Sequence, residues 1–168
     1  RAGVIDVLQA MGARLTLSHH RMEGDEEVAD VTAESSQLNA TEIGGDLIPR
    51  LLDEVPVLAL AACYAKGTTV VRDAQELRVK ESDRIKTTVQ ELSRLGADIQ
   101  EQPDGMLIHG AKELRGALGH SCGDHRLAMT LGIAGLLVKG ETQIQNAEVA
   151  SVSYPGFWDD MNTLTDDS

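Results

Sequence analysis

Aromatic residues are scarce in this chain of 168 residues, of which they make up 2%. So few rings argue against a base-stacking platform for nucleic acid and against a sandwich or barrel built on aromatic packing. Cations are scarce too, because 15 Lys and Arg face 27 Asp and Glu, for a formal net charge of −12. Nucleic acids and anionic membranes need a basic surface, so we expect no binding to either. A small phosphorylated ligand needs only a local cluster of cations and is compatible with this balance.

Cysteines and long apolar runs are limited as well. The two cysteines predict no disulfide framework, and Cys63, which lies in an apolar run, is expected to be buried. No stretch approaches the roughly 18 uninterrupted apolar residues of a membrane span, and no signal peptide opens the chain. Apolar residues make up 42%, which is enough for a core of Leu, Val, Ile and Ala. We therefore expect a soluble, cytoplasmic α/β chain and, because it starts with Arg rather than Met, a fragment.

Apolar periodicity predicts alternating helices and short strands. Helices are expected over four segments, each followed within two residues by glycine: residues 4–11, 53–65, 85–95 and 124–138. Strands are expected at residues 13–17, 68–72, 97–100, 106–109 and 142–145. A hairpin turn is expected at residues 103–105 and a solvated acidic connection at residues 23–27. Residues 153–158 hold three of the aromatic side chains and should open a terminal helix that docks through its rings.

The sequence also resembles itself. Residues 8–15 correspond to residues 92–99, and residues 66–74 correspond to residues 139–147. This self-similarity predicts about two copies of a unit made of two helices and several short strands. Equivalent helices should begin near Asp53 and near Arg126. Helices related in this way are expected to aim their N-termini at a common face.

The densest polar cluster lies where the third helix should begin. Four of the 15 cations fall between Arg78 and Lys86, and Ser82 or Asp83 is a natural N-cap for the following helix. A helix N-terminus flanked by Lys and Arg binds anions, because its free N–H groups and dipole add to the side-chain charge. A charged, solvated turn before a helix is the simpler interpretation of the same residues.

A second cluster begins at His120. Asp124 is a candidate N-cap for a helix whose first turn holds His125 and Arg126, which would face an anion. A capped helix with exposed polar residues explains the pattern too. A metal site made of His120, Cys122 and His125 is not favoured, because the spacing fits no standard zinc pattern.

A third cluster is the carboxylate pair Asp53 and Glu54, which opens an otherwise apolar helix. Carboxylates at a helix N-terminus are stabilised by the helix dipole whatever else they do. An acid held beside apolar surface can also act as a general base. Both interpretations stay open on the residues alone.

Four segments, in order, resemble the 5-enolpyruvylshikimate-3-phosphate synthase family. Residues 78–84 resemble its signature R-x-K-E-S/T-D-R, and residues 124–129 resemble its segment D-H-R-x-A-M. Residues 44–56 and residues 153–155 resemble the family as well. The resemblance covers the C-terminal lobe of the family. The N-terminal lobe, which carries much of the shikimate 3-phosphate site, has no counterpart in this sequence.

The resemblance implies an α/β (α+β) fold, an inside-out α/β barrel lobe built from repeated βαβαββ units around buried helices. Residues 1–168 would form the C-terminal lobe of an enolpyruvyl transferase, incomplete at its N-terminal end, with about two of three repeat units. The implied reaction transfers the enolpyruvyl group of phosphoenolpyruvate to the 5-hydroxyl of shikimate 3-phosphate and releases phosphate through a tetrahedral intermediate. It implies no metal or organic cofactor, the missing N-terminal lobe as partner, and a monomeric full-length enzyme.

The resemblance also assigns catalytic roles to two carboxylates. Asp53 resembles the residue that contacts the shikimate hydroxyls and serves as base. Glu81 resembles the acid that protonates the methylene carbon of phosphoenolpyruvate. Proton transfer to a vinyl carbon needs an acid whose pKa is raised by its surroundings.

The cations receive binding roles from the same resemblance. Lys80 resembles the cation of the shikimate 3-phosphate site, and Arg84 and Arg126 resemble the pair that binds phosphoenolpyruvate, with His125 beside them. A ligand with a carboxylate and a phosphate suits arginine forks at helix N-termini. One position departs from the pattern, because some members have Lys where this chain has Val152.

Two other functions compete with this one. UDP-N-acetylglucosamine enolpyruvyl transferase shares the fold and the chemistry, but the joint presence of the segments at residues 78–84 and 124–129 favours the shikimate enzyme. A chain of a different class would be a non-catalytic lobe that only docks a partner.

Overall fold

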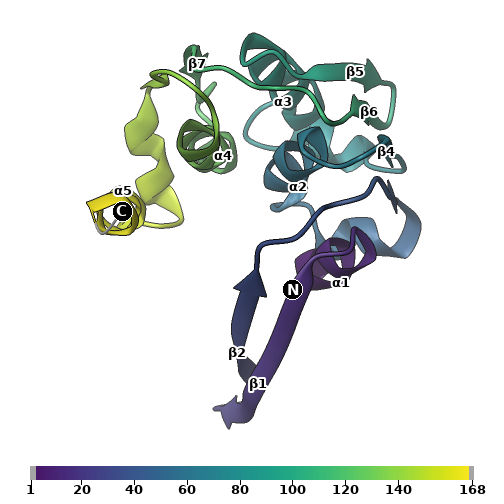
Figure 1. Cartoon of the computed structure of the whole chain (residues 1–168), viewed down its shortest axis with the longest axis vertical. Coiled ribbons are helices and arrows are strands. Elements are labelled where there is room, and N and C mark those ends of the chain that lie inside the picture. Colours follow the sequence, from purple (N-terminus) through teal and green to yellow (C-terminus); the bar gives the residue numbers. More distant parts are fainter. Residues whose placement is uncertain (1–2, 167–168) are drawn as a thin grey trace.

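The computed structural model describes residues 3–166 and combines helices with small sheets (Figure 1). The helices are α1 (Gly3–Ala10), α2 (Val55–Cys63), α3 (Arg84–Arg94), α4 (His125–Leu137) and α5 (Phe157–Asp166). Short 3-10 helices are η1 (Gly45–Arg50), η2 (Gln75–Val79) and η3 (Ala147–Val152). The strands are β1 (Arg14–Glu23), β2 (Glu26–Glu34), β3 (Glu42–Ile43), β4 (Thr68–Val71), β5 (Asp98–Gln102), β6 (Gly105–His109), β7 (Leu118–His120) and β8 (Gln143–Gln145). None of the described helices is long and apolar enough to cross a membrane.

The central sheet has the strand order β3-β4-β6-β5. Strand β3 runs parallel to β4, whereas β6 pairs antiparallel with both β4 and β5. With the helices between them, the elements from β3 to β6 follow the order β-α-β-α-β-β. The elements α1-β1-β2 precede this unit, and β7-α4-β8-α5 follow it, with β7 parallel to β8. The chain therefore holds one complete βαβαββ unit between parts of two others.

The self-similarity of the sequence recurs in the fold. Helix α1 leads into the hairpin β1–β2 as α3 leads into β5–β6, and α2 leads into β4 as α4 leads into β8. The glycines that follow these helices all have φ between 89° and 102°: Gly12, Gly67, Gly96 and Gly140. A side chain is disfavoured in this left-handed region, so glycine ends each helix. The predicted helices and glycine stops are confirmed, and the number of units in the whole lobe stays a prediction.

Two predicted boundaries were wrong. Helix α2 begins at Val55, so Asp53 lies in the turn before it instead of in its first turn. The predicted strand at residues 13–17 extends to Glu23 and pairs with β2, so the acidic connection shrinks to the hairpin turn. Most side chains of both strands are exposed, so the hairpin lacks the apolar alternation by which strands are recognised. Strand β7 has three residues and was also missed.

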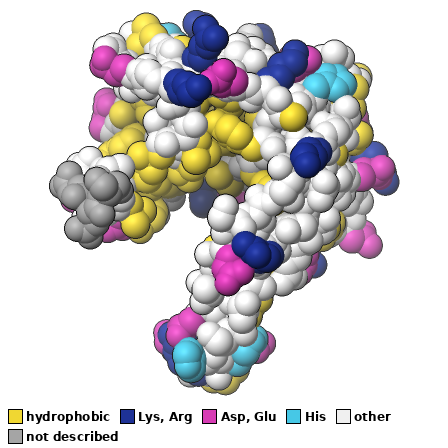
Figure 2. Space-filling model, in the orientation of Figure 1, with side chains coloured by type: hydrophobic (Ala, Val, Ile, Leu, Met, Phe, Trp, Pro, Cys, Tyr) yellow, Lys and Arg dark blue, Asp and Glu magenta, His cyan; other side chains and the backbone are white. Residues whose placement is uncertain are grey.

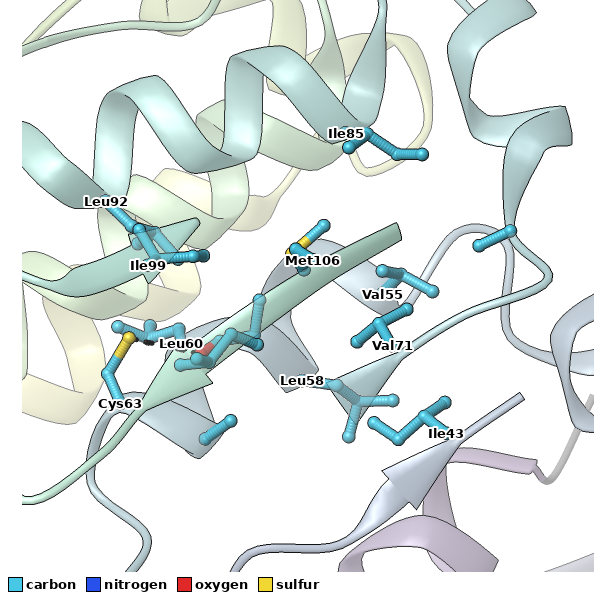
Figure 3. Close-up of a cluster of buried hydrophobic side chains, with 14 of the residues drawn as sticks. Ile43, Val55, Leu58, Leu60, Cys63, Val71, Ile85, Leu92, Ile99 and Met106 are labelled. Carbon is cyan, nitrogen blue, oxygen red and sulfur yellow. Dashed lines mark hydrogen bonds between the residues drawn. The ribbon is translucent and has the colours of Figure 1, made fainter. Parts of the chain in front are cut away.

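The main core lies between α2, α3 and the central sheet (Figure 3). Helix α2 is apolar on nearly every side, and seven of its nine residues are buried: Val55, Pro56, Leu58, Ala59, Leu60, Ala62 and Cys63. Figure 3 shows Leu58 beside Val71 of β4, and Leu60 and Met106 of β6 belong to the same buried cluster. Burial raises the pKa of the Cys63 thiol to about 12. The expected aliphatic core and the buried cysteine are therefore confirmed.

A smaller core joins α5 to α4. Phe157 and Trp158 meet edge to face, with ring centroids 4.9 Å apart, and pack near Ala128 and Met129 of α4. The Trp158 indole donates a hydrogen bond to the carbonyl of Ala147 at 3.0 Å. The terminal helix thus docks through its aromatic side chains, as the sequence predicted.

The contact between β6 and α2 generates a test of the fold. A Cβ atom on Gly110 would lie 2.0 Å from the Ala65 carbonyl oxygen and 2.6 Å from that of Ala62. We expect Gly110→Ala to lower the free energy of unfolding by about 1–3 kcal/mol, as measured by urea denaturation, because the backbones must separate. Gly156→Ala is the control, since its nearest neighbours are 3.9 Å away. Equal stabilities of the two variants would contradict this packing.

Candidate active site

The N-terminal ends of α2, α3 and α4 meet at one place. Arg84, the first residue of α3, donates hydrogen bonds to Asp53 in the turn before α2 and to Asp124 before α4. Arg126, in the first turn of α4, reaches Asp53 at 3.2 Å. The expectation that these helices share one face for their N-termini is confirmed by these contacts.

Local capping sets the start of two of these helices. The Asp83 carboxylate accepts the N–H of Lys86 at 3.1 Å and caps α3, and Asp124 accepts the N–H of Arg126 at 2.9 Å and caps α4. Aspartate at these positions satisfies an N–H group that the helix itself leaves unpaired. The sequence predicted Asp124 as a cap and left the cap of α3 open between Ser82 and Asp83, of which the structure uses Asp83. Each cap is followed directly by a first turn that carries a cation.

The deepest part of the site is a buried ion pair between Arg84 and Asp124. Their side chains are 1% and 0% exposed, and two hydrogen bonds of 2.8 and 3.3 Å join them. The remaining guanidinium N–H groups reach the Leu52 carbonyl, Asp53 and Glu81, the last at 2.5 Å. Burial opposes the charge of Arg84, but the hydrogen bonds and attraction from Asp124 outweigh it and raise the pKa of Arg84. Every donor of this arginine therefore has an acceptor.

The outer part of the site is more exposed. Glu81 is 45% exposed, Arg126 28% and Asp53 21%. Asp53 joins the two arginines, because one carboxylate oxygen accepts from Arg84 and the other from Arg126. A ligand that approaches from solvent would meet these three side chains, while Arg84 and Asp124 form the floor.

A cavity of about 150 Å³ lies beside Asp53 and Arg126. Its other lining residues are Glu54, which directly precedes α2 and has a buried Oε2 without a hydrogen-bond partner within residues 3–166, and residues of α2, α4 and α5 that are mostly apolar, among them Val57, Met129 and Phe157. Among the described residues, the Arg126 Nε is buried and lacks a hydrogen-bond partner. Arg126 thus keeps donor capacity beyond its bond to Asp53. Such an arrangement suits an anionic group that enters next to apolar surface.

The other residues predicted for the site lie around this cluster. Lys80 follows η2, is 27% exposed and bonds to Glu76 at 2.9 Å, not to the central carboxylates. His125 is half-buried at the first position of α4. Val152 ends η3 and is 74% exposed. Within residues 3–166, no group of His, Cys, Asp and Glu side chains is arranged to hold a metal ion.

Sequence reasoning missed one central contact. It placed Asp124 only as a helix cap, whereas the same carboxylate also accepts from Arg84 and from the Ser82 hydroxyl, at 3.1 Å. In the sequence, this contact could have been suspected from an aspartate and an arginine that each stand at the start of a helix with a buried face. Their pairing depends on how α3 and α4 pack, which periodicity does not reveal.

Comparison with known proteins places this fold in a class. Two solved structures superpose on 97% of the chain: an EPSP synthase from Acinetobacter baumannii, with a TM-score of 0.93 and 37% identity, and the enolpyruvyl transferase NikO from Streptomyces tendae, with 0.71 and 28%. The fold is thus that of the enolpyruvyl transferases. The profile of the EPSP synthase (3-phosphoshikimate 1-carboxyvinyltransferase) family matches residues 1–161, so the chain belongs to this family.

Curated relatives agree with this membership. A 3-phosphoshikimate 1-carboxyvinyltransferase of Herpetosiphon aurantiacus is 57% identical over 94% of this chain, and one of Synechococcus elongatus is 58% identical over 94%. The chain spans 37% and 35% of the lengths of these two relatives. It also covers 38% of the Acinetobacter structure. The chain therefore corresponds to somewhat more than a third of a typical relative.

The buried ion pair generates a stability prediction. We expect Asp124→Ala to lower the free energy of unfolding by about 3–5 kcal/mol, because it leaves the Arg84 charge buried without its main partner. The control is Glu76→Ala, which removes a partner of Lys80 that is 57% exposed and should cost at most about 1 kcal/mol. Urea denaturation measures both. An equal, small loss in the two variants would show that Arg84 is not held by Asp124.

Proposed function

We propose that this chain supplies one half of an active site that transfers the enolpyruvyl group of phosphoenolpyruvate to the 5-hydroxyl of shikimate 3-phosphate. The observation that carries the proposal is the meeting of Arg84, Arg126, Asp53 and Glu81 at three helix N-termini. Membership of the EPSP synthase family supports it. Because the chain spans little more than a third of its relatives, the other wall of the site would come from an N-terminal lobe.

Phosphoenolpyruvate would bind over Arg126 and the start of α4. Its carboxylate and phosphate need charged donors, and Arg126 has a donor that Asp53 does not use. Arg84 would act from the floor, and His125 lies next to Arg126 in the same helical turn. The positive end of the α4 dipole adds to the attraction for an anion.

Shikimate 3-phosphate would lie against Asp53 and Lys80. The Lys80 ammonium now bonds to Glu76, whose side chain is 57% exposed, and the phosphate would replace this weak surface partner. The Asp53 carboxylate, already held by two arginines, would accept the proton of the 5-hydroxyl. These arginines hold the Asp53 carboxylate in the orientation in which it can accept that proton.

The reaction would proceed by addition and then elimination. The 5-hydroxyl oxygen bonds to C2 of phosphoenolpyruvate as its proton passes to Asp53, and Glu81 donates a proton to the methylene carbon. The Glu81 carboxylate then takes a proton back from the methyl group of the resulting tetrahedral intermediate. The bond from C2 to the phosphate oxygen breaks, and phosphate leaves with the proton that Asp53 holds. Glu81 is accessible to substrate because it is partly exposed, and Arg84 holds its carboxyl group in one orientation.

The site is open on this chain alone. Figure 2 shows hydrophobic side chains gathered in a hollow between the projecting hairpin β1–β2 and the α5 side of the molecule. Docking of an N-terminal lobe over the site would exclude water and strengthen every ionic contact with the substrates. A monomeric full-length enzyme and a cytoplasmic location remain predictions. The named relatives do not favour transfer to UDP-N-acetylglucosamine or a purely docking role.

Reconstitution tests the proposed function. Residues 1–168 should bind phosphoenolpyruvate no better than roughly millimolar and show no turnover, because a few exposed ionic contacts bind weakly. Addition of the N-terminal lobe of a close relative should restore phosphate release with shikimate 3-phosphate as acceptor. UDP-N-acetylglucosamine is the control acceptor and should stay inactive. Steady-state turnover by residues 1–168 alone would refute the assignment of a half site.

Two variants of the reconstituted enzyme separate chemistry from binding. Glu81→Gln should lower kcat by about 10²- to 10⁴-fold and leave the affinity for phosphoenolpyruvate nearly unchanged, because it removes only the proton donor.

Arg126→Lys keeps the charge but loses the two-pronged guanidinium, so it should weaken phosphoenolpyruvate binding and leave shikimate 3-phosphate binding nearly unchanged. Steady-state kinetics with each substrate varied in turn measure both effects. A near-normal kcat for Glu81→Gln would remove Glu81 from the proton-transfer step.

A further inference from the structure

Arg78 lies two residues before Lys80, and its guanidinium donates four hydrogen bonds outside the central cluster. It donates to the Pro103 carbonyl at 2.8 Å and to the Gln102 carbonyl at 2.6 Å. It also donates to the carboxylates of Asp83 and Glu101, each at 2.8 Å. The side chain is 25% exposed, so these contacts are partly shielded from water.

The ion pair between Arg78 and Asp83 closes the loop of residues 79–82. This loop carries Lys80 and Glu81, and its two ends are joined by that single side-chain contact. Asp83 also caps α3 through its other carboxylate oxygen, so the closed loop is attached directly to the helix that begins with Arg84. The ion pair and the cap together limit how far the loop can move from Arg84.

The other contacts of Arg78 attach the loop to a rigid base, the turn between β5 and β6. The Asp104 carbonyl in this turn accepts the Ala74 N–H at 2.7 Å, and its carboxylate accepts the Asp73 N–H at 2.9 Å. Gly105 lies so close to β4 that a Cβ atom there would be 1.9 Å from the Val71 carbonyl oxygen. The turn therefore has little freedom to move.

Apolar packing does little to hold this loop. Val79, its first residue, is 80% exposed, and the contact between Lys80 and Glu76 is a surface ion pair. Exposed ion pairs of this kind stabilise a conformation by at most about 1 kcal/mol. Leu77, the residue before Arg78, is fully buried and anchors η2, so Arg78 is the main polar support of the loop on its N-terminal side. A lysine could not replace it, because one ammonium group cannot reach two carbonyls and two carboxylates in a plane.

We propose that Arg78 is a positioning residue, which closes the loop of residues 79–82 and holds it on the β5–β6 turn so that Lys80 and Glu81 keep their places beside Arg84. This inference rests on the proposed function for its effect on catalysis, but its structural part stands on the contacts alone. Displacement of a catalytic group by about 1 Å costs up to about 10²-fold in rate. Arg78 itself touches neither substrate.

Steady-state kinetics of the reconstituted enzyme test the catalytic part. Arg78→Gln should lower kcat by about 10- to 100-fold and raise the KM for shikimate 3-phosphate. The KM for phosphoenolpyruvate should change less, because Arg126 binds this substrate from another element.

Asp83→Asn retains a capping side chain but loses the ion pair, and should change kcat and KM in the same direction. The double variant should be little worse than Arg78→Gln, because both changes break one contact. Arg72→Gln, which removes another arginine paired with surface carboxylates, is the control and should leave kcat unchanged.

Hydrogen exchange on the 168-residue chain tests the structural part without any activity. Arg78→Gln should speed exchange of the Lys86 amide, which bonds to the Asp83 carboxylate that Arg78 holds, and leave the buried strands β4 and β6 protected. Uniformly faster exchange, or equal losses of affinity for both substrates, would indicate general destabilisation and overturn the proposal. Unchanged exchange of the Lys86 amide would overturn it as well. If Arg78→Gln speeds exchange locally but the reconstituted wild-type enzyme shows no turnover, the proposed function is rejected and the positioning contact is retained.

Discussion

The buried ion pair between Arg84 and Asp124 is the contact on which the arrangement of the site depends. Both groups are almost completely removed from water, and each begins or caps a different helix. Separation of α3 from α4 at this end would leave an unpaired charge in an apolar interior, at a cost of several kcal/mol. The pair therefore fixes the register of α3 against α4. It determines which residues of the two helices face each other, and with them the positions of Asp53 and Arg126.

The repeated topology explains why charged groups gather here. In each repeat a strand leads into a helix, and the helices with apolar faces are buried side by side. Parallel placement of α2 and α4 in equivalent units brings their N-terminal ends to the same side of the molecule. Three helix dipoles and two arginines then attract anions, while three carboxylates balance the charge in the absence of ligand. In this chain, elements from repeated units thus bring these charged groups together.

The exposure of the side chains divides the site into layers with different tasks. The floor, made of Arg84 and Asp124, is closed to water and has no free donor, so it serves mainly to orient. Above it, Asp53 connects the floor to Arg126, and Glu81 is the most exposed of the carboxylates. Arg78 holds the segment that presents Glu81 and Lys80, from a side that faces away from the central cluster. The outer carboxylates are thus held in place by arginines and still reached from solvent.

Local sequence alone determined much of this protein. The helix ends at Gly12, Gly67, Gly96 and Gly140, the caps at Asp83 and Asp124, and the family signature were all visible in short segments, because each depends on neighbours within one or two turns. Tertiary structure alone decided the contacts between distant residues. Arg84 meets Asp124 across 40 residues, Arg78 meets Gln102 across 24, and β2 is a strand only because β1 pairs with it. No periodic pattern encodes such pairings, since they follow from how helices and strands pack once the chain has folded.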